Sequence, residues 1–234
     1  MNTWEVAGDS FSSYTKPLTL SVETGQVLGR AGIFGGYDFW LKDDRVILEW
    51  INQEWTTEFQ HTACPLAYFT TTLKSEMEAK LLKWGMYPVE PAGFCGRIDF
   101  DVADRAQGIW VKEDWSDRVE DYGLTLAYNN FNASEGAISI GLAGNSSWDS
   151  YVYFFHPVDS GFRNRNFSQV SNDRNVYYYF SENFKSGSIY TKVVLLKMTG
   201  NREILLQYID RGTGEIPSDP SSLFNASEAT RYTR

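Results

Sequence analysis

The second half of the chain constrains the fold most, because it repeats one simple pattern. Short stretches alternate apolar and polar side chains, as in residues 97–102, and each is followed by a cluster of Asn, Asp, Ser or Gly. Alternation with a period of two is typical of half-buried strands, and those residue types favour turns. The stretches are 97–102, 107–112, 124–128, 137–142, 151–155, 176–180, 189–198 and 203–209. They predict an antiparallel up-and-down barrel or a two-sheet sandwich over residues 91–234.

The first half of the chain predicts a smaller β unit. Residues 1–18 are expected to be an irregular lead-in or one edge strand, while 18–22, 37–41 and 45–51 alternate as strands do. An apolar stripe over residues 71–84 predicts one helix. We therefore expect a mostly β protein with three parts: a small β unit (1–68), a linking helix (69–90) and the barrel or sandwich (91–234). The tail from Gly212 is rich in Pro, Ser and Asp, and we expect it to wrap the surface or to fray.

Charge and hydropathy narrow the choice of partners. The formal net charge is −9, and no basic stripe runs along the sequence, which argues against nucleic acid and against anionic membrane surfaces. No apolar run reaches the length of about 18 residues that a membrane span needs. Aromatic residues make up 16% of the chain, which suits a β protein and also suits a stacking surface for sugars.

The two cysteines and the sequons indicate an extracytoplasmic location. Cys64 and Cys95 both adjoin turn-type residues, and we expect them to form a disulfide, although two buried free thiols are the alternative. Four Asn-x-Ser sequons point the same way. They begin at Asn132, Asn145, Asn166 and Asn225. We expect a secreted or periplasmic protein whose signal peptide is not present in this chain.

Two segments carry a family resemblance. Residues 22–32 read Val-Glu-Thr-Gly-Gln-Val-Leu-Gly-Arg-Ala-Gly, and residues 64–69 read Cys-Pro-Leu-Ala-Tyr-Phe. Over residues 18–69 the chain thus resembles the lysostaphin/LytM-type zinc peptidases, which carry V-x-x-G-Q-x-(I/L)-G-x-x-G and end on D-P-x-x-Y/F. The resemblance implies a small hybrid β fold. Biotinyl, lipoyl and sugar-phosphotransferase domains share the first turn, and an unrelated small β unit is the other interpretation.

The zinc ligands of that family are absent from the matching positions. The family places His-x-His on the next strand, where this chain has Gly36 and Asp38. The two histidines, His61 and His156, are too far apart in sequence for ligand spacing, and a catalytic zinc needs three protein ligands with one open position. The resemblance therefore implies a catalytically inactive relative, and we expect no metal and no cofactor.

A second, shorter resemblance concerns the start of the predicted barrel. Gly108-Ile109-Trp110 resembles the Gly-x-Trp of lipocalin-like barrels. In those proteins the Trp closes one end of the barrel beside an Arg from a late strand, and Arg202 or Arg211 is the expected counterpart here. A barrel of eight strands either holds one small ligand or is filled by its own side chains.

Acidic residues supply the remaining candidates for chemistry. Asp99, Asp101 and Asp104 form a cluster that predicts either a hard-cation site or the solvated face of a strand and its turn. The acidic stretch 113–121 surrounds Trp115, and a glycosidase would use two such carboxylates beside an aromatic platform.

These observations favour a non-catalytic binding protein. Its ligand is expected to be a small apolar molecule in the barrel, or a glycan or cell-wall component on aromatic faces. The candidate ligand-binding residues are Trp110, Trp115, Phe155 and Tyr178. The alternatives are a structural or interaction protein and a glycan hydrolase, whose carboxylates would come from Asp99, Asp101, Asp114 or Asp117. We expect neither nucleic-acid binding nor membrane insertion, and the sequence does not specify an oligomeric state.

Overall fold

The computed structural model describes thirteen stretches of the chain. These are residues 2–6, 9–13, 19–27, 40–83, 87–88, 99–115, 120–129, 132–141, 151–180, 185–186, 189–190, 192–210 and 218–234. Contacts divide the chain into two compact units, Met1–Phe39 and Trp40–Arg234, which we describe separately. The predicted boundary at residue 68 rests on the family resemblance and stays a prediction.

The first unit contains a β-hairpin. Strands β1 (Asn2–Val6) and β2 (Asp9–Ser13) pair antiparallel, with Trp4 opposite Phe11. The expectation of an irregular lead-in or a single edge strand was therefore wrong. Residues 19–22, which alternate in sequence, are not part of a strand.

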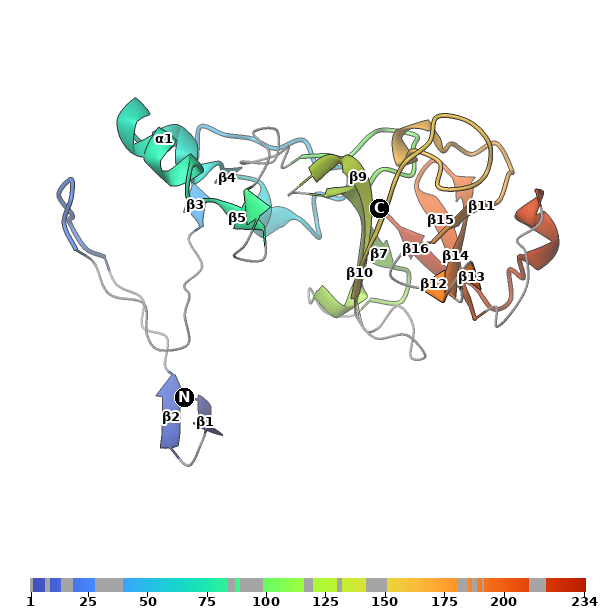
Figure 1. Ribbon diagram of the computed structural model, residues 1–234, viewed down its shortest axis with the longest axis horizontal. Helices are drawn as coiled ribbons and strands as arrows, with labels where there is room; N and C mark the ends of the chain where they lie inside the picture. The colour runs from blue at the N-terminus through green and yellow to red at the C-terminus, as the bar shows by residue number, and fades with distance from the viewer. Residues whose placement is uncertain are drawn as a thin grey trace. The chain divides into compact units, whose positions relative to one another are not determined.

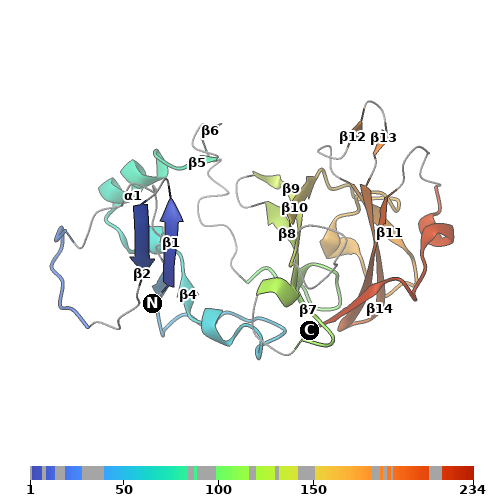
Figure 2. The same ribbon diagram turned by 90° about the horizontal axis from the view of Figure 1, so that it is seen from below.

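The second unit is built on one eight-stranded antiparallel sheet that nearly closes into a barrel, which confirms the predicted fold class (Figure 1). Its order is β10-β9-β8-β7-β16-β15-β14-β11. The strands are β7 (Gly108–Lys112), β8 (Gly123–Asn129), β9 (Asn132–Ile140), β10 (Tyr151–Phe155), β11 (Tyr177–Tyr179), β14 (Lys192–Gly200), β15 (Glu203–Asp210) and β16 (Thr230–Thr233). Figure 2 shows β8, β9 and β10 on one side, facing β11 and β14 on the other.

Strand β16 corrects the prediction that the tail wraps the surface or frays. It lies in the middle of the sheet, pairs with β15 on one side and β7 on the other, and buries Tyr232 completely. Strand β16 has only four residues, and Tyr232 is the only large apolar residue among them. Alternation over so few residues is too weak a signal to recognise in the sequence.

The remaining elements of the second unit are short. Helix α1 (Thr71–Glu78) starts at Thr70, whose hydroxyl accepts a hydrogen bond from Leu73 N. It ends earlier than the predicted residue 84, and it buries none of its residues. Three two-stranded sheets consist of β3 (Leu41–Lys42) with β4 (Thr62–Ala63), β5 (Leu82–Lys83) with β6 (Tyr87–Pro88), and β12 (Lys185–Ser186) with β13 (Ile189–Tyr190). Residues 45–51, predicted as a strand, form no strand.

The segment before β7 is a loop, although residues 97–102 were predicted to form a strand. Its described part, residues 99–102, pairs with no strand. Instead Arg105 N donates to Val102 O, and Val102 N donates to Gln107 O, across a turn in which Asp104 has a φ of 59°. Asp is one of the few residues other than Gly that tolerates this left-handed conformation, because its short side chain bonds locally.

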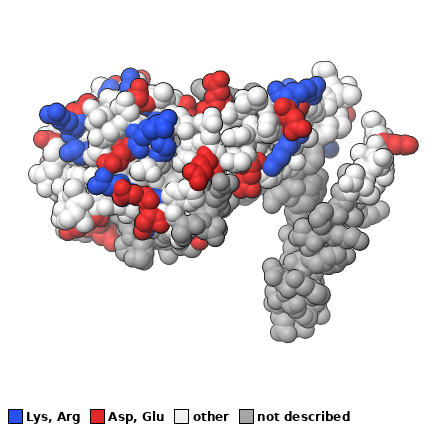
Figure 3. Space-filling model, turned by 180° about the vertical axis from the view of Figure 1, so that it is seen from behind, with Lys and Arg blue, Asp and Glu red and all other residues white. Residues whose placement is uncertain are grey.

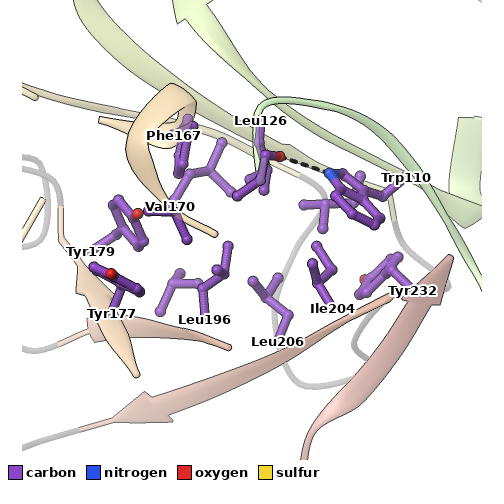
Figure 4. Packing of buried hydrophobic residues seen from close by; sticks show 14 of the residues in the cluster. Trp110, Leu126, Phe167, Val170, Tyr177, Tyr179, Leu196, Ile204, Leu206 and Tyr232 are labelled. Atoms are coloured by element: carbon purple, nitrogen blue, oxygen red, sulfur yellow. Dashed lines mark hydrogen bonds between the residues drawn. The ribbon is translucent and has the colours of Figure 1, made fainter. Parts of the chain in front are cut away.

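Large side chains fill the interior of the sheet. Figure 4 shows two facing rows of them, one including Trp110 and Leu126 and the other Leu196, Leu206 and Tyr232. These side chains are almost completely inaccessible to water. At about 25 cal/mol per Å², their burial is the main source of stability for this unit.

The two edge strands of the sheet meet through aromatic rings. Phe155 on β10 lies 5.1 Å, centroid to centroid, from Tyr179 on β11. Phe167, from the connection between these strands, contacts both rings at 5.2 and 4.9 Å. Edge-to-face and tilted rings at such distances attract one another beyond their buried area. The sheet is therefore closed at this seam by side-chain packing.

Gly136 on β9 should be intolerant of a side chain, because a Cβ there would lie 2.3 to 2.8 Å from ring atoms of Phe155. Phe155 is held by Phe167 and Tyr179 and has little room to move. We expect Gly136→Ala to lower the free energy of unfolding by about 1–3 kcal/mol, measured by chemical denaturation. Gly200→Ala is the matched control, since its Cβ would meet nothing nearer than 3.7 Å. Equal stabilities of the two variants would contradict the proposed packing.

Candidate functional site

One end of the barrel is organised around Trp110. Its indole N–H donates a hydrogen bond to Ala106 O over 2.8 Å (dashed line in Figure 4). The guanidinium carbon of Arg234 lies 4.1 Å from the centroid of the Trp110 ring. The arginine that lies over this tryptophan is Arg234, the residue after β16, which was not one of the two candidates named from the sequence. Arg202, one of the two expected candidates, contributes only its carbonyl oxygen, which accepts from Arg234 N. Arg211, the other, lies outside the described residues.

Arg234 also binds the loop that precedes β7. Its guanidinium donates to the carbonyl oxygens of Gln107 and Val102, each over 2.8 Å, and of Arg105 over 2.6 Å. Burial lowers the pKa of Arg234 to about 10, so the side chain stays charged at neutral pH. A Cβ on Gly108 would lie 2.3 Å from this guanidinium and 2.5 Å from Asp101, so only glycine fits there.

Asp101 holds the same loop from the other side. Its carboxylate accepts hydrogen bonds from Ile109 N at 2.8 Å and from Ile51 N at 2.9 Å, which ties residues of the 40–60 region to the barrel. Burial raises the pKa of Asp101, although both hydrogen bonds and Arg234 oppose that rise. The carboxylate therefore has a structural role as an acceptor of backbone N–H groups. The expectation of a solvated strand face does not describe it.

The other residues of the predicted acidic cluster do not complete a metal site. Asp99 is half-buried and Asp104 is exposed. Among the residues that the structure describes, no group of three or more His, Cys, Asp or Glu side chains is arranged to hold a metal ion. The Nδ1 atom of His61 lies 2.7 Å from Val46 O, and His156 is exposed.

The four predicted ligand-binding residues do not come together. Trp110 and Phe155 belong to the barrel core, whereas Tyr178 packs in a separate cluster with Phe180, Val193 and Leu195. Trp115 lies edge-to-face against Trp55, with ring centroids 5.3 Å apart. Of the hydrolase candidates outside the acidic cluster, Asp114 is exposed and pairs with Lys112, while Asp117 is outside the described residues.

An exposed aromatic surface lies instead on residues 40–68. We call it the Trp40 surface; it consists of Trp40, Lys42, Asp43, Arg45, Phe59, Thr62 and Tyr68. Trp40 and Tyr68 are 48% and 47% exposed, which is unusual for such large apolar side chains. The β3–β4 pair supports this surface, since Lys42 is directly opposite Thr62.

The ring of Trp40 is held in one orientation. Its indole N–H donates to the hydroxyl of Thr62 over 3.0 Å. Phe59 contacts it with a centroid distance of 5.6 Å, and the ammonium of Lys42 lies 4.6 Å from the centroid. An exposed aromatic ring that is already oriented loses little conformational freedom on binding.

Polar groups of fixed geometry follow Lys42 directly. The carboxylate of Asp43 accepts hydrogen bonds from the Arg45 guanidinium, from Arg45 N and from the Tyr68 hydroxyl. The hydrogen bond from the Arg45 guanidinium is the main reason that the pKa of Asp43 lies well below its usual range, and the hydrogen bond from the Tyr68 hydroxyl is the second. The hydrogen bond between the Tyr68 hydroxyl and Asp43 also raises the pKa of Tyr68. Asp43 is therefore a permanent carboxylate beside a mainly exposed guanidinium.

The sequence contained only part of the signal for this surface. In the sequence, Lys42, Asp43 and Asp44 are residues typical of a turn, and Trp40 belongs to the predicted strand 37–41, which does not indicate whether its ring is exposed. The exposure of Trp40 depends on the pairing of residues 41–42 with residues 62–63, which lie 20 positions away along the chain.

Charges of both signs are interspersed on the face of the molecule shown in Figure 3. Over the described residues of this face, no extended basic area is visible. Within the same described ranges, no helix has the length and apolar character needed to cross a membrane.

Comparisons with known proteins return no relationship. No family model matches the chain, and neither a curated protein nor a solved structure matches it. The candidate site therefore rests on its own geometry.

Asp101 should make stability depend on pH in a direction opposite to most carboxylates. Because its pKa is raised in the folded chain, the folded chain binds more protons than the unfolded chain at pH values just above 3.8, the ordinary value. We expect the free energy of unfolding of the wild type, relative to Asp101→Asn, to fall as the pH rises through this window and then to level off. Urea denaturation at a series of pH values measures this difference.

Asp114 provides the control for that experiment. Lys112 lowers its pKa, so the wild type should gain stability relative to Asp114→Asn as the pH rises. If the free energy of unfolding of the wild type relative to Asp101→Asn also rose with pH, burial would not be what controls the pKa of Asp101.

Proposed function

We propose that this chain is a non-catalytic extracytoplasmic binding protein that binds a glycan on the Trp40 surface. The single observation that carries the proposal is the oriented, half-exposed ring of Trp40. The C–H faces of a sugar ring are apolar and pack on aromatic rings, and its hydroxyl groups need donors and acceptors at the edge of that ring. The ammonium of Lys42, 4.6 Å from the centroid of the Trp40 ring, is a donor at this edge, and the hydroxyl oxygen of Thr62, which binds the indole N–H, is an acceptor there.

Because side chains fill the interior of the barrel, we expect the ligand to bind on the surface of the protein and not inside the barrel. Trp110, Leu196 and Leu206 have no accessible surface, so a ligand would have to displace core side chains. Creating such space costs several kcal/mol, as large-to-small substitutions in protein cores show. Of the two ligand classes expected from the sequence, the glycan is therefore the one that the structure supports.

Two of the four candidate carboxylates for a hydrolase, Asp101 and Asp114, are engaged in other interactions. Such an enzyme needs two carboxylates in one cleft, one of them protonated at working pH. Asp101 is occupied by two backbone N–H groups, and the pKa of Asp114 is lowered by Lys112. Neither residue is free for the role of general acid.

Trp40→Ala should weaken glycan binding at least about tenfold, since ring stacking contributes about 1.4 kcal/mol or more in such a site. The measurement is isothermal titration of the full chain with chitotetraose, cellotetraose and soluble peptidoglycan fragments. Tyr128→Ala is the matched control, because Tyr128 is an exposed aromatic residue on β8, away from this surface. Absence of binding to every sugar at millimolar concentration, or equal binding by Trp40→Ala, would refute the proposal.

The extracytoplasmic part of the proposal is supported by the cysteines. No free cysteine occurs among the described residues, which include Cys64 but not Cys95. We therefore retain the predicted Cys64–Cys95 disulfide as part of this proposal.

Cys64→Ser should lower the free energy of unfolding by about 3–4 kcal/mol, because a disulfide over this loop restricts the unfolded chain. The double variant, with Cys95→Ser added, should be no less stable than the single one. Under denaturing conditions the wild type should react with a thiol reagent only after reduction, as mass spectrometry can show. Two reactive thiols without reductant would rule out the bond.

A further inference from the structure

Three of the four Asn-x-Ser sequons lie in the described part of the chain, and they share one local geometry. In each, the side-chain Oδ1 of Asn accepts hydrogen bonds from both the backbone N–H and the hydroxyl of the Ser two residues later. At Asn225 these distances are 3.1 Å from Ser227 N and 2.8 Å from Ser227 Oγ. The turn thus presents the two side chains that define the sequon next to one another.

The three sequons differ in how far they are exposed. At Asn166 the middle residue is Phe167, which is buried in the barrel core against Phe155 and Tyr179. The Oδ1 of Asn166 also accepts from the Tyr128 hydroxyl over 3.1 Å. Asn132 is half-buried and begins β9.

Among the three described sequons, only the one at Asn225 has all three of its residues exposed. Asn225, Ala226 and Ser227 lie between strands, after the short 3₁₀ helix Pro220–Leu223. Their turn is anchored to the sheet, because Asn225 N donates to Gln207 Oε1 over 2.7 Å. Gln207 is itself buried on β15 and donates to Glu228 over 3.0 Å. The sequon is therefore held in place while its side chains face solvent.

We propose that Asn225 is an N-glycosylation site of the folded protein and that Asn166 is not. The donor is an oligosaccharide joined through a diphosphate to a lipid. A bond forms between Asn225 Nδ2 and the anomeric carbon of the sugar, the bond from that carbon to the phosphate oxygen breaks, and the amide nitrogen loses one proton. No oxidation or reduction is involved.

Burial determines which sequon keeps a glycan in the native protein. A glycan is bulky and strongly hydrated, so the chain must fold with it in water. Asn225 meets this condition without any rearrangement. At Asn166 a glycan has to be accommodated beside Phe167, which holds the seam between β10 and β11 together. This inference shares an extracytoplasmic location with the proposed function, but it does not depend on glycan binding by the Trp40 surface.

The test is secretion of the full chain from cultured animal cells behind an added signal peptide. Peptide mapping after amidase release in ¹⁸O-water identifies each glycosylated Asn, because release converts that Asn to labelled Asp. We expect label at Asn225 in most molecules and none at Asn166. Intact-mass analysis should show that Asn225→Gln and Ser227→Ala each lose the mass of one glycan.

Ser222→Ala is the matched control, because Ser222 is an exposed serine of the same region that belongs to no sequon. It should leave the glycan mass unchanged. An unlabelled Asn225 in the secreted, folded protein would overturn the proposal, and so would label at Asn166. Sugar binding by the unglycosylated chain is measured separately, so a failure here leaves the proposed function intact.

Discussion

The barrel depends on the interactions of one guanidinium group. Arg234 covers the ring of Trp110 and donates to three carbonyl oxygens of the loop before β7. Charged hydrogen bonds in a buried setting are strong, and they add to the backbone hydrogen bonds that the carbonyl oxygens of Val102 and Gln107 already accept within the loop. This one residue therefore joins the strand in the middle of the sheet to the loop that leads into its neighbour, and it seals that end of the core.

Asp101 extends the same arrangement towards residues 40–60. It accepts from Ile109 on β7 and from Ile51, while facing the charge of Arg234. The region that carries the Trp40 surface is thus attached to the barrel through a partly buried carboxylate. With the interior filled by its own side chains, the barrel acts as a rigid support, and recognition is left to the surface.

The strands with clear alternation were predictable, whereas features made by distant residues were not. β10 was predicted with its observed bounds, and β7 and β15 to within a residue at either end, because each is a short run rich in apolar and aromatic residues that is bounded by turn residues. Strand β16 was missed because its four residues carry too little alternation to be recognised. Arg234 was missed as the partner of Trp110 because the two residues lie 124 positions apart in the sequence and meet only through the pairing of β16 with β7. Residues 99–102 alternate like a strand, but hydrogen bonds from Gln107 and Arg234 hold them as a loop. For the candidate site, the turn at Lys42–Asp44 was predictable, but the exposure of Trp40 was not.

The place of β16 in the sheet sets an order for folding. β7 to β10 form a meander of neighbouring strands, and β14 with β15 forms a hairpin, so both can pair locally as soon as they are synthesised. The backbone hydrogen bonds that join these two halves into one sheet form when residues 230–233 insert between β7 and β15. Until then each half exposes an open edge and half of the apolar interior, a state prone to aggregation. Assembly of this barrel should therefore be completed late, after the ribosome has translated nearly all of the chain printed here.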